Sequence, residues 1–421
     1  SEYFFKLLTE ISVTIISTTM KIVRGSWSTF VRRLFAAVVG GLLIFAATLP
    51  LAASASSPTS QRNVAATLQT AALTSSNVMQ IEAGSDFVCA LFRDGRVKCW
   101  GDNSFGGLGQ ENTTQIGDAT GEVASLNYID LGSGARAKQI AAGGSYACAL
   151  LTNGQVQCWG YSDFGNLGIS DRDGLGDAPG EMGSSLVRAN LGTGLTVRSI
   201  ATSNYNTTCA IFTDGRLKCF GYNRYGGAGA GVSDQTLGAS DSELGDALPF
   251  VDLGTNRYAV KVAPGGEHTC AILDDGSVKC WGLNDRGQLG VGDSTNRGTT
   301  AASMGDALPT VGLGTGRTAV DIASGDDHTC VILDNATVKC WGDGTFGRLG
   351  QGNSNHVGDT AGEVASLSPV SLNTTLPPIS IVAGSSSNCV KFATGLVKCW
   401  GYNNTGQLGI GSTTTIGDGS G

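Results

Sequence analysis

Twelve cysteines offer the most specific chemistry in this sequence. They form six pairs, each with nine residues between its members, and the pairs recur about every 60 residues. Paired thiols can close disulfides, contribute to a zinc site or stay buried as free thiols. Nine intervening residues is not a zinc-ligand spacing, and a tetrahedral site needs four ligands brought together. We therefore expect disulfides, with zinc and free thiols as the alternatives. The pairs are Cys89 with Cys99, Cys148 with Cys158, Cys209 with Cys219, Cys270 with Cys280, Cys330 with Cys340 and Cys389 with Cys399.

Carboxylates follow the cysteine pairs in a second repeating pattern. Gly-Asp recurs after each pair, and three copies continue to Gly-Glu. Oxygen ligands of this kind suit a hard cation such as calcium. The alternative is that these side chains are solvated or cap their own loops, because three of the six copies lack the glutamate. We expect no cofactor. The calcium candidates are Asp118, Glu122, Asp177, Glu181, Asp359 and Glu363.

Histidine chemistry is sparse. His268 and His328 occupy the same slot, two residues before a cysteine, where the other copies have Phe, Tyr, Thr or Ser. Because the residue type at this position differs among the copies, a packing role is favoured over the role of a catalytic base. His356 falls in a loop. The sequence has neither a recognisable Ser-His-Asp signature nor a phosphate-binding glycine loop, so we expect a protein that is not an enzyme.

The repeat itself predicts short strands. In the fourth copy, alternating or β-branched residues favour strands at 260–263, 268–273 and 277–281. A three-residue loop, 274–276, joins the last two, and its glycine suits a position that must be left-handed. The fifth copy has Ala336 at that position, which predicts local strain there or a shift of the left-handed residue to Asn335.

This loop also sets the register of the hairpin. Counting outward from it, Ile272 faces Val278 and Cys270 faces Cys280. The cysteines then lie opposite each other at a non-hydrogen-bonded position, where side chains approach closely enough for a disulfide. Each bridge would close a loop of about 11 residues, with an effect of about 2–3 kcal/mol through the unfolded state. Such a set of disulfides indicates an oxidising compartment.

A glycine-rich corner follows each hairpin, for example Gly-Gln-Leu-Gly at 287–290. A long loop comes next, and then we expect a fourth strand, such as 128–131 or 250–253. Four short strands per unit is the content of a propeller blade. The predicted fold is therefore all-β, a β-propeller of four-stranded blades over residues 78–421, with six hairpins visible and truncated from a seven-bladed ring.

The N-terminal region has the composition of a processing signal. A basic segment, an apolar run at 34–51 and Ala-Ser-Ala at 53–55 predict a signal peptide at 20–55, with a retained anchor as the alternative. Residues 1–19 would precede the true start, and 56–77 would be a linker. Residues 1–55 carry a net charge of +3, so the −8 of the whole chain becomes −11 after cleavage. That charge argues against a nucleic-acid partner. Membrane contact is expected only through the signal segment.

The segments CAILDDGSVKCWGLNDRGQLG at 270–290 and CVKFATGLVKCWGYNNTGQLG at 389–409 resemble the repeat of the regulator-of-chromosome-condensation family. The resemblance covers residues 78–421 and implies a seven-bladed β-propeller. The cysteine pairs resemble those of secreted prokaryotic members. Family functions include nucleotide exchange on a small GTPase, ultraviolet sensing through tryptophans and inhibition of a secreted β-lactamase. None carries over cleanly to this acidic chain with a leader.

The function we predict is a secreted or cell-surface scaffold that binds a protein or glycan through its long loops. Loops on repeat scaffolds commonly hold the recognition surface. One alternative is a carbohydrate-active or other enzyme with carboxylates at the mouth of the central channel. Another is a purely structural surface protein. The loops in question are 109–126, 169–186, 230–248 and 291–308.

Overall fold

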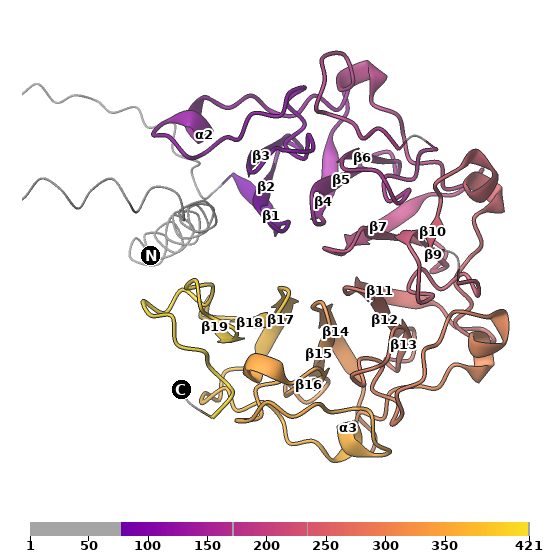
Figure 1. The fold of residues 1–421 in the computed structure, drawn as a ribbon, viewed down its shortest axis with the longest axis vertical. Helices are drawn as coiled ribbons and strands as arrows, with labels where there is room; N and C mark the ends of the chain where they lie inside the picture. The colour runs from indigo at the N-terminus through magenta and orange to yellow at the C-terminus, as the bar shows by residue number, and fades with distance from the viewer. Residues whose placement is uncertain (1–76, 171, 234, 420–421) are drawn as a thin grey trace, which may run out of the picture.

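The computed structural model describes residues 77–170, 172–233 and 235–419, which form six small antiparallel sheets around a central axis (Figure 1). The sheets follow one another in chain order, so each is one blade of a β-propeller. The predicted all-β propeller is confirmed. The segments 1–19, 20–55 and almost all of 56–77 lie outside the described residues and stay predictions, as does a seventh blade. In the described part, no helix is long and apolar enough to cross a bilayer.

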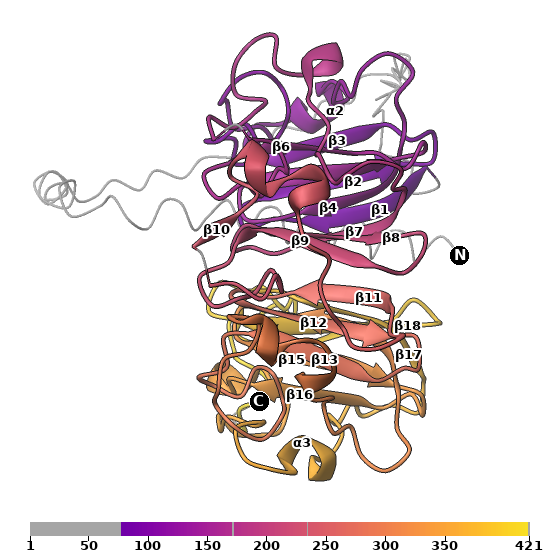
Figure 2. The same ribbon diagram turned by 90° about the vertical axis from the view of Figure 1, so that its right-hand side faces the viewer.

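Each blade starts with an inner strand beside the axis and continues outward through a hairpin, and the strands run roughly along the axis (Figure 2). Short helices lie in the outer loops, except η7 (Thr345–Gly347), which leads into the corner of the fifth blade. The strands are β1 Val78–Ala83, β2 Phe87–Phe92, β3 Val97–Gly101, β4 Ala137–Ala142, β5 Tyr146–Leu151, β6 Val156–Gly160, β7 Val197–Thr202, β8 Thr207–Phe212, β9 Leu217–Tyr222, β10 Thr236–Leu237, β11 Ala259–Pro264, β12 His268–Leu273, β13 Val278–Gly282, β14 Ala319–Ser324, β15 His328–Leu333, β16 Val338–Gly342, β17 Pro378–Ala383, β18 Ser387–Phe392 and β19 Val397–Gly401. The helices are α2 Glu122–Ser125, η2 Gly183–Ser185, η3 Asp241–Glu243, η4 Gly245–Ala247, η5 Ala301–Ser303, η6 Gly305–Ala307, η7 Thr345–Gly347 and α3 Glu363–Ser366.

The hairpin register is the one predicted from the three-residue loop. In the fourth blade Ile272 pairs with Val278, and Cys270 pairs with Cys280. The same register places every cysteine pair at Cα–Cα distances of 4.0–4.1 Å, and all six pairs are disulfides. Each disulfide therefore joins the second and third strands of its own blade. In chain order, Cys89 is bonded to Cys99, Cys148 to Cys158, Cys209 to Cys219, Cys270 to Cys280, Cys330 to Cys340 and Cys389 to Cys399.

The predicted fourth strands at 128–131 and 250–253 are wrong, and five of the six described sheets have three strands. Among the described residues, only the third sheet has a fourth strand, the two-residue β10. In the first blade a single bridge joins Gly101 to Ile116 instead. The expected strand at 128–131 adds one bond, from the Ile129 amide to the Val97 carbonyl (2.9 Å). The loop between these two contacts folds into α2, so the chain does not run beside the blade long enough to build a ladder.

The loop of the fifth hairpin keeps the left-handed turn without a glycine. Ala336 itself has φ +61°, close to the +77° of Gly276, so the expected shift to Asn335 does not occur. The Ala336 amide donates to the Leu333 carbonyl at 2.9 Å, as the Gly276 amide does to Leu273. Because a Cβ crowds this conformation, Ala336 carries a penalty of about 1–2 kcal/mol.

Neighbouring blades pack through the glycine-rich corner. The Trp341 indole N–H donates to the Gln288 carbonyl (2.9 Å), within the corner of the preceding blade. A Cβ on Gly290 would lie 2.6 Å from the indole nitrogen, so this corner position must be glycine. Trp159, Trp281 and Trp400 donate equivalent bonds. The tryptophan of one blade and the corner of the blade before it thus form one repeated joint.

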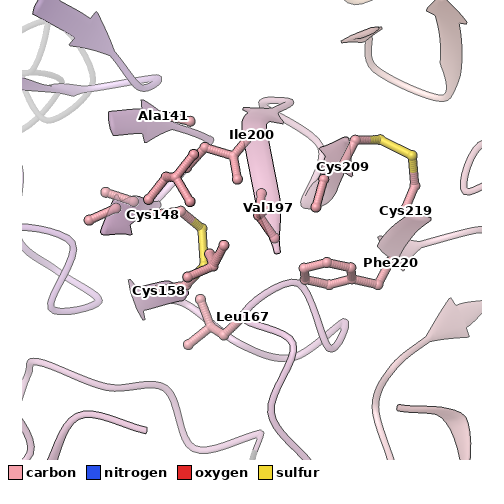
Figure 3. Close-up of a cluster of buried hydrophobic side chains, with 14 of the residues drawn as sticks. Ala141, Cys148, Cys158, Leu167, Val197, Ile200, Cys209, Cys219 and Phe220 are labelled. Atoms are coloured by element: carbon pink, nitrogen blue, oxygen red, sulfur yellow. A yellow bond between two sulfur atoms is a disulfide. The ribbon is translucent and has the colours of Figure 1, made fainter. Parts of the chain in front are cut away.

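The core continues between the blades as a layer of sulfur and apolar side chains. Figure 3 shows Ile200 and Phe220 of the third blade between the Cys148–Cys158 and Cys209–Cys219 disulfides. All of these residues are 4% exposed or less. The disulfides are therefore part of the packed core as well as covalent links.

Candidate functional site

The glutamates proposed as calcium ligands cap their own loops. Glu122 accepts the amides of Gly117 (2.7 Å) and Ala119 (3.0 Å) through one carboxylate oxygen. Glu181 and Glu363 make the equivalent bonds in their loops. In the third copy, where Gly238-Ala239 stands instead of Gly-Asp, Glu243 takes the same role at the same five-residue spacing from the glycine.

The aspartates of the same motif do not complete a cation site. Asp118 and Asp359 are exposed. Burial and the neighbouring Glu181 raise the pKa of Asp177. In the described ranges, no three His, Cys, Asp or Glu side chains are grouped closely enough to hold a metal ion. The arrangement therefore favours loop capping, and calcium binding stays an untested hypothesis.

His268 and His328 join neighbouring blades. His268 Nε2 lies 2.8 Å from Thr329 Oγ1, and His328 Nε2 lies 2.8 Å from Asn388 Oδ1. In the second blade Tyr146 uses the same slot to reach Thr208 Oγ1 (2.9 Å). Burial lowers the pKa of His268 to about 3 and that of His328 to about 4, so both are neutral near pH 7. These positions serve packing between blades.

The long outer loops are held to one another by polar contacts. Glu111, from the loop of the first blade, accepts the amides of Gly180 (2.9 Å) and Met182 (3.1 Å) in the next loop. Asp306 accepts the amide (2.8 Å) and the hydroxyl (2.6 Å) of Thr255 in the same way. Much of the polar capacity of these loops is therefore used within the propeller.

Buried lysines add to this fixation of the loops. The Lys279 ammonium donates to the carbonyls of Leu253 (2.9 Å) and Gly305 (2.8 Å), which belong to two successive outer loops. Lys218 does the same with Leu191 and Gly245. Burial lowers the pKa of both lysines. Polar and charged residues thus hold the outer loops in place, a structural role that the repeat pattern alone did not indicate.

A different surface leaves aromatic rings exposed. Phe105 of the first blade meets Tyr161 of the second edge-on, with ring centroids 5.1 Å apart. Tyr161 lies 6.0 Å from Phe164, which in turn meets Tyr222 of the third blade at 5.3 Å. Phe105 is 48% exposed, and the other three rings are half-buried. We call Phe105, Tyr161, Phe164 and Tyr222 the aromatic row.

Three carboxylates lie near the Tyr222 end of the aromatic row or near one another. Glu267, just before β12, lies close enough to Tyr222 that its negative charge adds to burial in raising the pKa of the Tyr222 hydroxyl. Asp326 and Asp327 occupy the corresponding turn before β15. Burial raises the pKa of all three carboxyls, and Asp327 adds repulsion at the other two. The same three carboxylates raise the pKa of Tyr205, which places that exposed ring beside them. We call the aromatic row and these carboxylates together the aromatic face.

The predicted functional loops did not include this face. Its rings come from two slots of each repeat: the residue after Trp-Gly or Phe-Gly, such as Tyr161 and Tyr222, and the residue before the corner, such as Phe105 and Phe164. The recurrence of aromatic residues at two fixed slots was a usable signal. The contact between slots of adjacent blades was not visible in one repeat.

The comparison with family models matches most hairpins of the chain. A model described as the regulator of chromosome condensation (RCC1) repeat matches residues 78–106, 137–166, 197–226, 259–288 and 319–348. A second model with the same description matches residues 275–332. The matched segments begin at or near the inner strands and run into the corners, which are the parts that build the blades.

The relatives with a curated name share the repeat over part of their length. The ultraviolet-B receptor UVR8 of Arabidopsis thaliana is 29% identical over 279 residues, covering 66% of this chain and 56% of the receptor. The E3 ubiquitin-protein ligase HERC2 of Homo sapiens is 28% identical over 349 residues, covering 82% of this chain and 6% of the ligase. The chain therefore spans about half of the first protein and a small part of the second.

Solved structures share the propeller fold. Yeast RCC1 (Prp20), solved bound to Kap60, superposes with a TM-score of 0.62 at 19% identity, covering 80% of this chain and 73% of that one. Human WBSCR16 has a TM-score of 0.60 at 18% identity, covering 81% of this chain and 80% of that one. At these identities the likeness concerns the fold alone.

Proposed function

We propose that this chain, whose blades are RCC1 repeats, is an exported scaffold that binds a protein partner through its aromatic face. The observation that carries the proposal is the aromatic row, in which rings from three successive blades are fixed against one another while Phe105 stays 48% exposed. Rigid aromatic side chains contribute large contact area at small entropic cost and are enriched at protein interfaces.

The scaffold supports such a role because the blades cannot shift easily beneath the row. Each blade is crossed by a buried or half-buried disulfide, and the tryptophan–corner bond joins the first blade to the second beneath the row, whereas the third blade packs the buried Phe220 ring at that position. Residues on a rigid frame lose little entropy on binding. Yeast RCC1 shares the propeller fold, and Prp20p has been described with its binding to Gsp1p and histones.

Export is supported by the cysteines. Six disulfides and no free cysteine among the described residues suit an oxidising compartment, because cytosolic reductants keep most thiols reduced. The predicted signal peptide at 20–55 agrees with this assignment. Detection of the processed protein outside the cytoplasm of its native host, with its new N-terminus after Ala55, is the expected result. Intact precursor in the cytoplasm would contradict it.

A photo-crosslinking experiment tests the binding face. A benzophenone amino acid placed at Phe105 in the exported domain would be irradiated with envelope and supernatant proteins of the native host. The matched control carries the same group at Val187, which is 53% exposed in an outer loop. We expect a discrete adduct from position 105 that is absent at 187 and is lost when Tyr161→Ala is added. Adducts from position 187 alone would move the site to the outer loops and overturn the proposal.

A second candidate function is an enzyme that uses the carboxylates beside the axis. Glu267, Asp326 and Asp327 have raised pKa values, which is a property of many general acids. Turnover of an oligosaccharide panel that disappears in Glu267→Gln or Asp327→Asn would favour this function. Turnover that both substitutions leave intact would exclude these groups as catalysts.

A further inference from the structure

The aromatic face combines exposed rings with an excess of negative charge. Glu267 connects the two parts, because its charge acts on Tyr222 at the end of the aromatic row. Asp285 adds a further exposed carboxylate that acts on both Glu267 and Asp327. The neighbouring cation of Asp285 itself is Arg286, whose guanidinium lies 3.8 Å away. The negative charges are therefore continuous with the rings.

The cations nearest to these carboxylates do not neutralise them. Arg224 and Arg348 lower the pKa values of Glu267 and Asp327, but less than burial raises them. The Arg348 guanidinium lies 3.4 Å from Asp343 instead. None of the ion pairs found among the described residues includes Glu267, Asp326 or Asp327. A cation from outside would relieve this repulsion.

The rings of the row also lack the cations that cover other rings of this chain. The Arg96 guanidinium lies 3.8 Å from the ring centroid of Tyr128, and Arg216 lies 4.0 Å from that of Phe250. Within the described ranges, no such contact involves Phe105, Tyr161 or Phe164. Phe105 in particular stays 48% exposed, so part of its ring is open to a cation or a methylene chain.

We infer that the protein segment bound by the aromatic face is an extended peptide that carries lysine or arginine side chains. The inference rests on the proposed function and specifies the chemistry of the partner. Basic side chains would place their apolar stems over the rings of the row and their charged ends near Glu267 and Asp327. The row crosses three successive blades, so the bound segment must extend across blade boundaries.

Other ligand classes match these observations less well. A phosphate-bearing ligand would meet carboxylates instead of cations. A neutral sugar could stack on the rings, but it would leave Glu267 and Asp327 without a compensating charge. Sugar binding is therefore kept as an outcome of the test.

Fluorescence anisotropy with defined peptides tests the inference. The probes are a labelled oligo(Gly-Lys) peptide, a matched oligo(Gly-Glu) peptide and a labelled neutral oligosaccharide of N-acetylglucosamine, each titrated with the exported domain. We expect binding of the lysine peptide that weakens as sodium chloride is added, because screening reduces the attraction. Equal binding of the glutamate peptide, or binding of the oligosaccharide alone, would overturn the inference.

Variants locate the binding on the aromatic face. Glu267→Gln with Asp327→Asn should weaken lysine-peptide binding about tenfold. Phe105→Ala should weaken it about threefold to fivefold. The matched control, Asp241→Asn with Asp359→Asn, removes the same charge from exposed outer loops and should leave affinity unchanged. An equal loss in the control would show that only net charge matters and would refute the assignment.

Competition separates this inference from the proposed function. If the benzophenone at Phe105 captures a partner and excess oligo(Gly-Lys) does not suppress the adduct, the face binds protein but the basic-segment inference fails. If position 105 captures nothing while the lysine peptide binds and responds to the variants, the proposed function fails and the face is a cation-binding surface only. Suppression of the adduct by the lysine peptide, but not by the glutamate peptide, supports both.

Discussion

Replacement of His268 by tyrosine should remove a defined part of the acid sensitivity of the fold. The substitution copies the second blade, where Tyr146 occupies the same slot and bonds to Thr208. Thr329, the counterpart of Thr208, is already the partner of His268. A glycine lies beneath the ring in both blades, Gly143 under Tyr146 and Gly265 under His268, so the larger ring has a matching site.

The magnitude follows from the pKa of His268, which burial lowers from 6.5 to about 3. The unfolded state therefore binds a proton first as the pH falls, and stability is lost from about pH 6.5 down to about pH 3. At about pH 4 the loss amounts to about 3 kcal/mol, at 1.36 kcal/mol per pH unit. The raised pKa values of Glu267 and Asp326 act in the opposite direction, because stability from the protonated forms is lost as pH rises. That contribution is common to both proteins and cancels in the comparison.

The assay is chemical unfolding of the oxidised protein, followed by tryptophan fluorescence, at about pH 7 and about pH 4. We expect similar stabilities at neutral pH and a smaller acid-induced loss in His268→Tyr, by about 3 kcal/mol. His328 remains in both proteins as an internal reference with its own lowered pKa. Parallel pH profiles for the two proteins would refute the assignment of a buried neutral histidine at position 268.

Three further predictions concern the repeat scaffold. Ala336→Gly should raise the free energy of unfolding by about 0.5–1 kcal/mol, and Gly276→Ala should lower it by about 1 kcal/mol, because both positions have a left-handed backbone. Thermal or chemical unfolding measures both changes. If the two substitutions change the stability in the same direction, the prediction is wrong. A mild thiol should reduce the Cys389–Cys399 disulfide first, because these two cysteines are half-buried whereas those of the other five disulfides are buried. Pulse alkylation with peptide mapping measures the order of reduction. Simultaneous reduction of all six disulfides would count against this prediction. Trp341→Phe should lower stability by about 1–2 kcal/mol through loss of the bond to the preceding corner, and an unchanged unfolding midpoint would mean that the joint contributes little.

The elements inside one repeat were predictable because their causes are local. A three-residue loop determines which residues face each other, so the pairing of Cys270 with Cys280 follows from counting, and Cys89 with Cys99 and Cys330 with Cys340 follow in the same way. The failed fourth strand depends on long-range geometry. Residues 128–131 have strand-like composition, but α2 intervenes and leaves only the Ile129 bond to the blade. Composition could not reveal how far the loop carries the chain from the blade edge.

The candidate site was harder to predict because its contacts join one repeat to the next. Phe105 and Tyr161 stand in different slots about one repeat apart, and their contact requires the angle between blades. The glutamates of the outer loops, by contrast, led to the prediction of a cation site that the structure does not favour. Their spacing suits cation ligands, but the backbone amides of the same loop are nearer donors and satisfy Glu122 and Glu181. A carboxylate pattern therefore indicates a metal only after the local backbone donors are counted.

Variation among copies separates into two kinds once burial is known. The slot of His268 holds different residue types in the six copies, yet Tyr146, His268 and His328 all bond to the next blade, so the variation at these copies follows the packing of each pair of neighbours. The slot of Phe105 drifts as well, but Phe105 and Phe346 are 48% and 42% exposed. Packing alone does not explain an exposed ring, and Phe346 keeps one despite a left-handed backbone that disfavours bulky residues. This slot holds an aromatic ring in some blades and Arg286 in the fourth. The aromatic face therefore differs from blade to blade around the axis, as binding of a single asymmetric partner requires.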